Sequence, residues 1–78
     1  MIGQRIEYNG IGIPKPGTYF RFGDSWHGMT PTGMLANLAK HDVVEHEDGT
    51  ITVSPSILVG NKSESWHGYL DRGVWRQD

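Results

Sequence analysis

A five-residue motif of an acidic residue, serine, tryptophan, histidine and glycine occurs twice in this chain of 78 residues. It covers residues 24–28 and again residues 64–68, and each copy is followed by a second glycine five positions on. An imidazole can serve as a metal ligand, a general base or a backbone hydrogen-bond partner, and an indole offers a flat apolar face. Because both copies have the same local setting, we predict that they converge on a shared centre.

His27 and His67, one from each motif, are the candidate metal ligands, and His46 is the third. A zinc ion takes four ligands in a tetrahedral array, or three ligands and a water molecule at a catalytic site. A metal-dependent hydrolase with zinc as cofactor is therefore one hypothesis. The alternative is that each ring packs and holds neighbouring backbone through its nitrogens. We favour this alternative because the chain lacks the tight ligand spacing of a known zinc site.

Four aromatic residues are candidates for contact with a ligand or partner: Trp26, Trp66, Tyr69 and Trp75. Their flat rings with polar tips suit stacking against a sugar or another small ligand. A small domain without cysteine, however, needs its largest side chains in the core. Burial of one such ring removes roughly 150–250 Å² from water. We therefore expect at least two of the three tryptophans to be buried.

A complete set of catalytic residues is not visible in the sequence. Ser25 and His27 fall on one face of a strand, because side chains alternate. A nucleophile also needs an oriented base and an oxyanion site, and no motif supplies them. The acidic residues Glu45, Glu47 and Asp48 are interpreted as a solvated hairpin face. No catalytic residue is assigned.

Composition narrows the classes of partner. The formal net charge is −2, and the seven lysines and arginines are spread along the chain rather than gathered in a basic stripe. Nucleic-acid binding is therefore not expected. No apolar run is long enough to cross a bilayer, and no signal peptide is readable at the start. We expect a soluble cytoplasmic protein that does not bind membranes.

The elements that must position these side chains begin with an arm. Residues 1–18 are rich in glycine, and Pro14 and Pro16 restrict the residues before them to extended conformations. We predict an extended or flexible N-terminal arm over residues 1–18 and a single small β-rich domain over residues 19–78. The alternating aromatic residues of segment 18–22 favour a strand.

The next segment has the features of a short helix. Thr30 suits an N-cap and Pro31 suits the first helical position. Met34, Leu35 and Leu38 then share one helical face. We predict one short α-helix near residues 31–41.

Two hairpins are predicted after the helix. In the first, the two-residue loop Asp48-Gly49 suits a type I′ turn, pairs Val44 with Val53 and puts His46 in the apolar row. After it, Pro55 should end the pairing or force an edge or a bulge, because it has no N–H to donate.

In the second hairpin, a three-residue loop ending at Gly73 joins residues 65–70 to residues 74–77. This register pairs His67 with Gln77 and places His67, Tyr69 and Trp75 on one face.

Three short motifs follow one another near the end of the chain: Pro-Ser-Ile at residues 55–57, Trp-His-Gly at 66–68 and Gly-Val-Trp at 73–75. Together they resemble a family of short bacterial and phage proteins classed as a domain of unknown function. The resemblance implies no activity. Many members of that family have cysteines near the position of the first repeated motif, residues 24–28 here, and before the final hairpin, which implies a structural zinc in those members. This chain has no cysteine, so its tryptophans would fill the same space.

The sequence as a whole predicts an α+β fold: a small antiparallel β-meander of three to five strands with the helix on its apolar face. We favour a non-enzymatic protein-interaction or accessory module of bacterial or phage origin, which binds a protein partner or self-associates. The small core, the extended arm and the incomplete catalytic set support this reading. The alternative is a histidine-ligated metal-binding domain, with a metal-dependent hydrolase as its enzymatic form.

Overall fold

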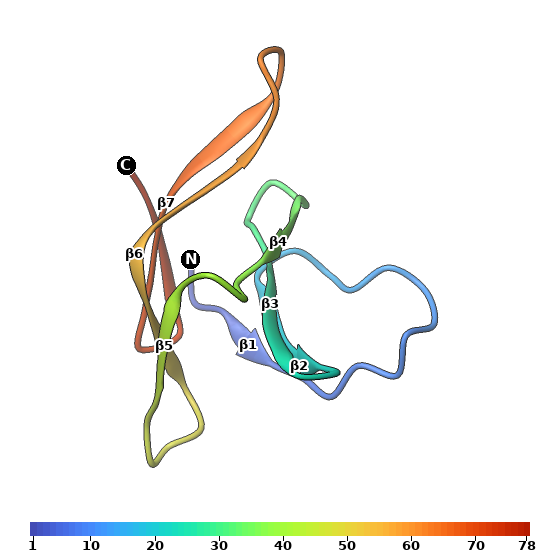
Figure 1. Ribbon diagram of the computed structural model, residues 1–78, viewed down its shortest axis with the longest axis vertical. Helices are drawn as coiled ribbons and strands as arrows, with labels where there is room; N and C mark the ends of the chain where they lie inside the picture. The colour runs from blue at the N-terminus through green and yellow to red at the C-terminus, as the bar shows by residue number, and fades with distance from the viewer.

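The computed structural model describes residues 1–78 and consists of strands and turns, with no helix (Figure 1). The prediction of an α+β fold is therefore wrong, and the fold is all-β. No helix is present that could span a membrane. Eight strands follow one another along the chain: β1 Gln4–Arg5, β2 Thr18–Phe22, β3 Ser25–Met29, β4 Leu35–Asn37, β5 Asp42–Glu45, β6 Ile51–Gly60, β7 Ser65–Asp71 and β8 Val74–Gln77.

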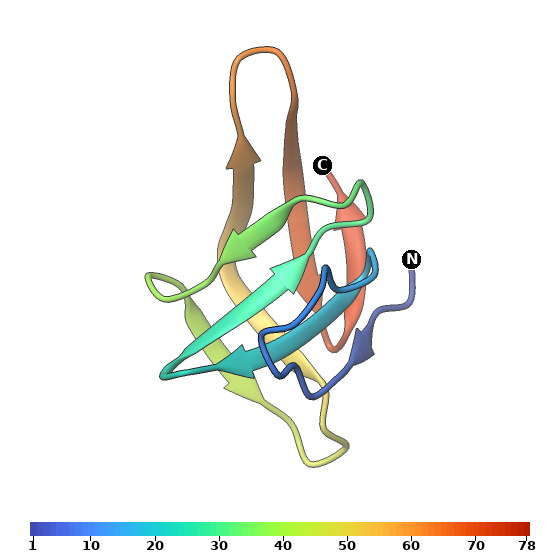
Figure 2. The ribbon, with the colours of Figure 1, turned by 90° about the vertical axis from the view of Figure 1, so that its right-hand side faces the viewer.

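The strands form two four-stranded sheets instead of one meander. The first sheet has the order β1-β2-β3-β4 and the second has the order β5-β6-β7-β8. All neighbouring strands are antiparallel except β1 and β2, which are parallel. The strands of the two sheets cross in Figure 2, and the buried apolar residues of both sheets form one core. This is a two-layer arrangement of sheets packed face to face.

The N-terminal residues connect the two sheets. Ile2 forms an antiparallel bridge with Val74 of β8, and β1 then pairs with β2 of the other sheet. Residues 1–6 therefore cover an edge of each sheet, which leaves fewer backbone groups without partners. Residues 7–17 form a loop that projects away from the strands (Figure 1).

The segment predicted as a helix contains β4 and two turns. Gly33 has a φ of +86°, which is incompatible with a continuing helix. Thr30 closes the turn, because its N–H donates to the Met34 carbonyl at 2.8 Å and its hydroxyl accepts from the Met34 N–H at 3.0 Å. Met34, Ala36 and Leu38 then face the core at a spacing of two residues. The apolar period here is that of a strand.

The first predicted hairpin exists, but its loop is one residue longer than expected. The His46 N–H donates to the Thr50 carbonyl at 2.8 Å, so three residues form the loop. Gly49, the last of them, has a φ of +88°. A three-residue loop that ends in a left-handed residue is a common hairpin connection.

This difference shifts the register of β5 by one residue. Val43, not Val44, pairs with Val53 and packs against the core. Val44 is exposed, and His46 lies beside Thr52 rather than in the apolar row. Both predicted faces of β5 are therefore reversed, as a one-residue slip requires.

Asp48 offers a test of the loop geometry. Hydrogen bonds from the hydroxyl and the backbone N–H of Thr50 hold the pKa of the Asp48 carboxyl below its usual value of 3.8. A depressed pKa means that the ionised carboxylate stabilises the fold above pH 3.8, and this stabilisation is lost as the pH falls through the folded-state pKa. We expect Thr50→Val to raise the pKa of Asp48, measured by NMR titration of the carboxyl carbon. The same pKa in Thr50→Val as in the parent would contradict the geometry, and Ser63→Ala in a different loop is the control.

The last hairpin has a shorter loop than predicted. Asp71 pairs with Val74 and Leu70 pairs with Trp75, so Arg72 and Gly73 alone form the loop. Their φ angles of 47° and 76° are those a type I′ turn requires. The one-residue shift moves Trp75 from the face predicted for it to the core face.

The core consists of ten buried residues that come from both sheets. All three tryptophans are among them, with exposed fractions of 9% for Trp26, 1% for Trp66 and 2% for Trp75. The expectation that at least two are buried is confirmed. The cluster is Tyr19, Trp26, Ala36, Leu38, Ile51, Val53, Ile57, Trp66, Leu70 and Trp75.

Strands β6 and β7 continue past their neighbours as a projecting two-stranded hairpin (Figures 1 and 2). The β6–β7 pairing shifts its register between Val53 and Ile57, around Pro55, which has no N–H to donate. Of the alternatives predicted at Pro55, an end to the pairing, an edge or a bulge, the structure shows the register shift of a bulge. Beyond it, Ser56 and Leu58 flank the inward-facing Ile57.

Candidate functional site

The two copies of the repeated motif lie in different sheets, in β3 and β7, and both of their indoles belong to the same buried core cluster. The rings of Trp66 and Trp75 pack edge to face with their centroids 5.5 Å apart. Gly28 of the first motif lies against the same ring, because a Cβ added there would be 2.8 Å from Cη2 of Trp75. Trp75 is therefore the common neighbour of both motifs.

The imidazoles point the other way, because successive side chains of a strand alternate. His27 lies parallel to the ring of Phe20, with centroids 5.8 Å apart, and its Nδ1 is 3.2 Å from the Ser25 carbonyl. His46 is hydrogen-bonded through Nε2 to the Thr52 hydroxyl at 2.7 Å.

His67 lies on the outer face of the second sheet, between Ser56 and Asp78. The three histidines predicted as metal ligands thus occupy three separate environments. No group of three or more histidine, aspartate or glutamate side chains has an arrangement that could hold a metal ion.

Of the four aromatic residues predicted to contact a ligand or partner, only Tyr69 is exposed, because the three indoles are in the core. Tyr69 borders a shallow depression of about 470 Å³ on the outer face of the second sheet. Arg76 lies at the same depression and forms an ion pair with Asp71 at 3.3 Å. A flat ring beside an arginine suits a small aromatic or acyl group.

A second aromatic cluster, which sequence reasoning missed, covers the outer face of the first sheet. It consists of Tyr8, Phe20, Phe22 and His27. Tyr8 comes from the projecting loop, and its ring centroid lies 4.9 Å from that of Phe20 and 5.6 Å from that of Phe22. The loop is thereby packed onto β2. We refer to these four residues as the aromatic cluster.

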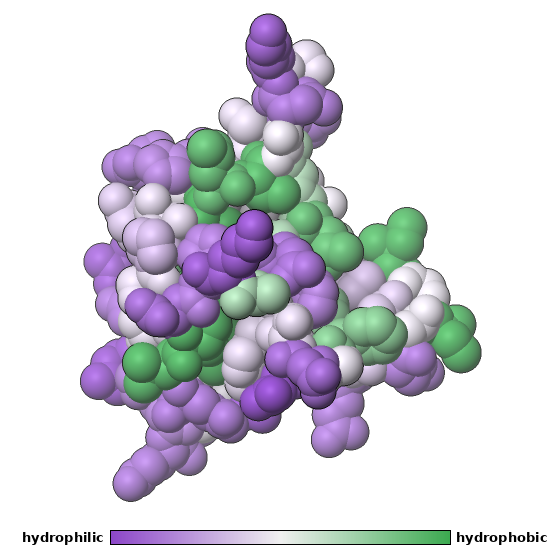
Figure 3. Space-filling model, in the orientation of Figure 1, coloured by the Kyte–Doolittle hydropathy of each residue, from purple (hydrophilic) through white to green (hydrophobic).

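The projecting loop presents apolar side chains to solvent. Ile11 and Ile13 are 80% and 89% exposed, and Phe22 at the edge of the aromatic cluster is also exposed. In Figure 3, separate hydrophobic groups stand out on the side where this loop projects in Figure 1, and others lie at the upper centre and lower left of the same view. The Tyr8 hydroxyl donates to the Gly12 carbonyl and the Ile11 N–H donates to Asn9 Oδ1 at 2.9 Å, so the loop is cross-linked by its own polar groups.

Two arginines flank the indole of Trp26 at the rim of the core. Their guanidinium carbons lie 5.0 Å (Arg5) and 5.8 Å (Arg21) from the ring centroid, within cation–π range. Arg5 pairs with Glu45 at 2.6 Å, whereas Arg21 makes no salt bridge.

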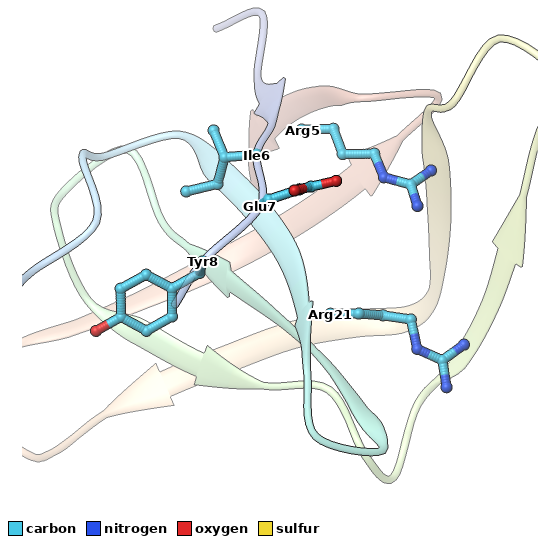
Figure 4. A pocket seen from close by; sticks show the side chains of 5 residues that line it. All are labelled: Arg5, Ile6, Glu7, Tyr8 and Arg21. Carbon is cyan, nitrogen blue, oxygen red and sulfur yellow. The ribbon is translucent and has the colours of Figure 1, made fainter. Parts of the chain in front are cut away.

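The two arginines line a depression of about 480 Å³ together with Ile6, Glu7 and Tyr8. Figure 4 shows both arginines extending to one side and Tyr8 to the other. The depression therefore joins a cationic rim to the aromatic cluster.

A buried hydroxyl lies beneath this region. Burial raises the pKa of Tyr19, and the nearby Asp48 carboxylate raises it further, while Arg5 opposes the shift. Tyr19 therefore stays neutral well into the alkaline range and belongs to the core rather than to a reactive site.

The aromatic cluster could have been predicted in part from the sequence, whereas the surroundings of His67 could not. The alternation of Phe20 and Phe22 in the predicted strand implied an apolar outer face, and Tyr8 was the one large aromatic side chain of the arm available to cover it. The placement of Ser56 and Asp78 beside His67 depends on strand register and was not visible.

Comparison with known proteins gives no relative: neither a protein-family model, nor a curated protein, nor a solved structure matches this chain.

Proposed function

We propose that this chain is a small protein-interaction module that binds its partner on the projecting loop and the aromatic cluster beneath it. The observation that carries the proposal is the exposure of Ile11 and Ile13 on the projecting loop. Exposed apolar side chains grouped beside polar ones are typical of interaction sites on small proteins.

The way in which the loop is held favours binding. Tyr8 packs onto Phe20 and Phe22, and side-chain contacts of Tyr8 and Asn9 tie the loop to itself. A surface fixed before it meets its partner loses less conformational freedom on binding. The two isoleucines are therefore presented in a defined geometry at little further entropic cost.

The neighbouring charges indicate the chemistry of the partner. The depression that Tyr8 lines also contains Arg21, whose guanidinium has no carboxylate of its own. Burial of apolar area would provide most of the affinity, and a carboxylate opposite Arg21 would fix the orientation. We infer a partner segment in which a long aliphatic or aromatic residue lies beside an aspartate or glutamate.

Selection of random peptides displayed on phage tests the proposal. Enriched peptides should combine an acidic residue with a large apolar one, and a synthetic copy should bind the purified chain in a fluorescence-anisotropy titration. Ile11→Ser/Ile13→Ser should weaken this binding at least about tenfold, which corresponds to about 1.4 kcal/mol. Arg21→Gln should weaken it less and should reduce its dependence on salt.

Val44→Ser/Leu58→Ser is the matched control, because it removes two exposed apolar side chains elsewhere on the surface. It should leave peptide binding unchanged. Peptides without the expected residues, or binding that survives Ile11→Ser/Ile13→Ser, would contradict the proposal. A molar mass that rises with concentration and falls back in the double isoleucine variant would assign the same surface to self-association instead.

A further inference from the structure

We propose that Ser56, His67 and Asp78 form a nucleophilic site for acyl transfer on the outer face of the second sheet. The Nε2 atom of His67 is 2.9 Å from the Ser56 hydroxyl, and its Nδ1 is 3.2 Å from Oδ2 of Asp78. A serine within hydrogen-bond reach of an imidazole, itself oriented by a carboxylate, is the arrangement of serine hydrolases, which recurs on unrelated folds. The site lies apart from the proposed interaction surface, which is on the first sheet.

Strands β6 and β7 and the residue that follows β8 bring these side chains together. Residue 67 of β7 pairs with Leu58 of β6, which puts Ser56 two residues along on the same outward face. On the other side, the Asp78 N–H donates to the His67 carbonyl at 2.9 Å, so the carboxylate lies beside the imidazole. Nε2 of His41 is hydrogen-bonded to the Ser56 carbonyl at 3.2 Å and anchors the serine backbone next to the bulge.

The hydrogen bonds fix the roles of the two ring nitrogens. The carboxylate of Asp78 can only accept, so Nδ1 of His67 carries the proton and donates. Nε2 then has a free lone pair and accepts from the Ser56 hydroxyl. This tautomer is the one in which histidine can remove the serine proton. Ser56 is thus the nucleophile, His67 is the general base and Asp78 is a positioning residue.

The site is exposed to solvent, and this exposure indicates the class of substrate. The side chains of His67 and Asp78 are 43% and 53% exposed, so an acyl group can approach without a conformational change. The ring of Tyr69 lies 6.4 Å from that of His67 and borders the depression that also contains Arg76. Water at an open site weakens electrostatic stabilisation of an oxyanion. We therefore assign small aryl esters, whose leaving group is a weak base and whose ring can pack on Tyr69.

The reaction follows from these positions in two steps. The Ser56 oxygen bonds to the ester carbonyl carbon while its proton passes to Nε2 of His67, and collapse of the tetrahedral adduct breaks the bond to the aryl oxygen, which takes that proton. Water then attacks the acyl-serine with His67 again as base, and the carboxylic acid leaves as Ser56 regains its proton. The balance is ester plus water to acid plus phenol.

Hydrolysis of p-nitrophenyl acetate by the full chain tests the assignment. We expect protein-dependent release of nitrophenol and an acetyl group on Ser56, detected by mass spectrometry after acid quenching. Ser56→Ala and His67→Gln should each lower the rate at least about tenfold, since general-base catalysis contributes typically 10²–10⁴-fold. Asp78→Asn should lower the rate less and should shift the pH–rate profile, which a purely structural carboxylate would not do.

Ser65→Ala and His46→Gln are the matched controls, because they remove a serine and a histidine outside the site; both should retain the parent rate. A fluorophosphonate probe that labels Ser56 in the parent chain gives a readout independent of whether a variant folds. Equal rates in Ser56→Ala and the parent, or acetyl groups only on histidine or lysine, would overturn the assignment. In that case an imidazole alone would account for the hydrolysis.

Discussion

Replacing Gly68 with alanine is expected to destabilise the protein by about 3 kcal/mol or more, the upper end of the cost of inserting a methyl group into a packed region. An added Cβ would clash with the backbone oxygen of Arg76 and would lie 2.5 Å from Cη2 of Trp66. The backbone oxygen cannot retreat without breaking the pairing of β7 with β8, and the indole is held by Trp75. Domains of this size have a free energy of unfolding of about 4–12 kcal/mol, so the variant would lose a large share of its stability. Thermal unfolding followed by circular dichroism measures the change.

Gly12→Ala separates the effect of packing from the effect of backbone strain. Gly12 has a φ of +78° and nothing within 4 Å of an added Cβ, so its substitution should cost only about 1–2 kcal/mol of left-handed strain. Gly28→Ala should fall between the two, because a Cβ there would lie 2.8 Å from Cη2 of the Trp75 ring but would meet side-chain atoms only, without the backbone clash found at Gly68. Should Gly68→Ala prove no more damaging than Gly12→Ala, the packing of the second motif described above is wrong.

The location of several strands could be predicted from the sequence, because local patterns determined them. The alternating aromatic residues of Thr18–Phe22 form β2 with the predicted limits. Both predicted hairpins exist, since Gly49 and Gly73 supply the positive φ that these turns need. Local turn chemistry is therefore sufficient to locate a hairpin in this chain.

Loop length was not determined by the same residues, and the predicted lengths of the two loops were exchanged. A glycine in the left-handed region suits the end of either a two-residue or a three-residue loop. Packing decides between them: only the observed registers put Val43 beside Val53 and Trp75 beside Leu70 on the core face. Burial of the largest side chain, Trp75, was the signal that could have corrected the second hairpin.

The exchange of loop lengths also concealed the candidate nucleophilic site. In the predicted register His67 is opposite Gln77, whereas in the structure Gln77 pairs with Gly68 and the residue beside His67 is Asp78. The one-residue shift in register therefore replaces the amide of Gln77 with the carboxylate of Asp78 next to the imidazole. The position of Ser56 depends in addition on the bulge at Pro55, which was expected but whose effect on register no local pattern determines.

The absent helix has a different cause. Met34, Leu35 and Leu38 fit a helical face, and Met34, Ala36 and Leu38 fit a strand face equally well. Pairing with β3 stabilises the strand conformation of β4, and the positive φ of Gly33 directs the chain into this strand. A short apolar segment next to glycine and proline takes the structure that its tertiary neighbours favour.

Trp75 is expected to be the most costly side chain to remove. Trp75→Ala should destabilise the protein by about 3–5 kcal/mol, the range for truncation of a buried aromatic residue. The ring contacts Trp66, lies against Gly28 of the other sheet and donates its Nε1–H to the Gly17 carbonyl at 2.9 Å. Its loss would therefore open a cavity where the two sheets and the N-terminal loop meet. Urea unfolding monitored by far-UV circular dichroism measures the loss.

Two further substitutions separate the contribution of the Trp75 hydrogen bond from the contribution of ring packing to stability. Trp75→Phe and Trp66→Phe remove similar volumes from the same edge-to-face pair. Trp75→Phe also removes the hydrogen bond from Nε1 to the Gly17 carbonyl, which then keeps only the Gln4 N–H at 3.1 Å as a donor. The Nε1 of Trp66, in contrast, is buried with no partner, and its removal relieves an unsatisfied group. Trp75→Phe should therefore be less stable than Trp66→Phe by about 1–2 kcal/mol. Equal stabilities would mean that the Trp75 hydrogen bond contributes nothing to joining the N-terminal loop to the second sheet, and the reverse order would mean that Trp66, not Trp75, holds the two motifs together.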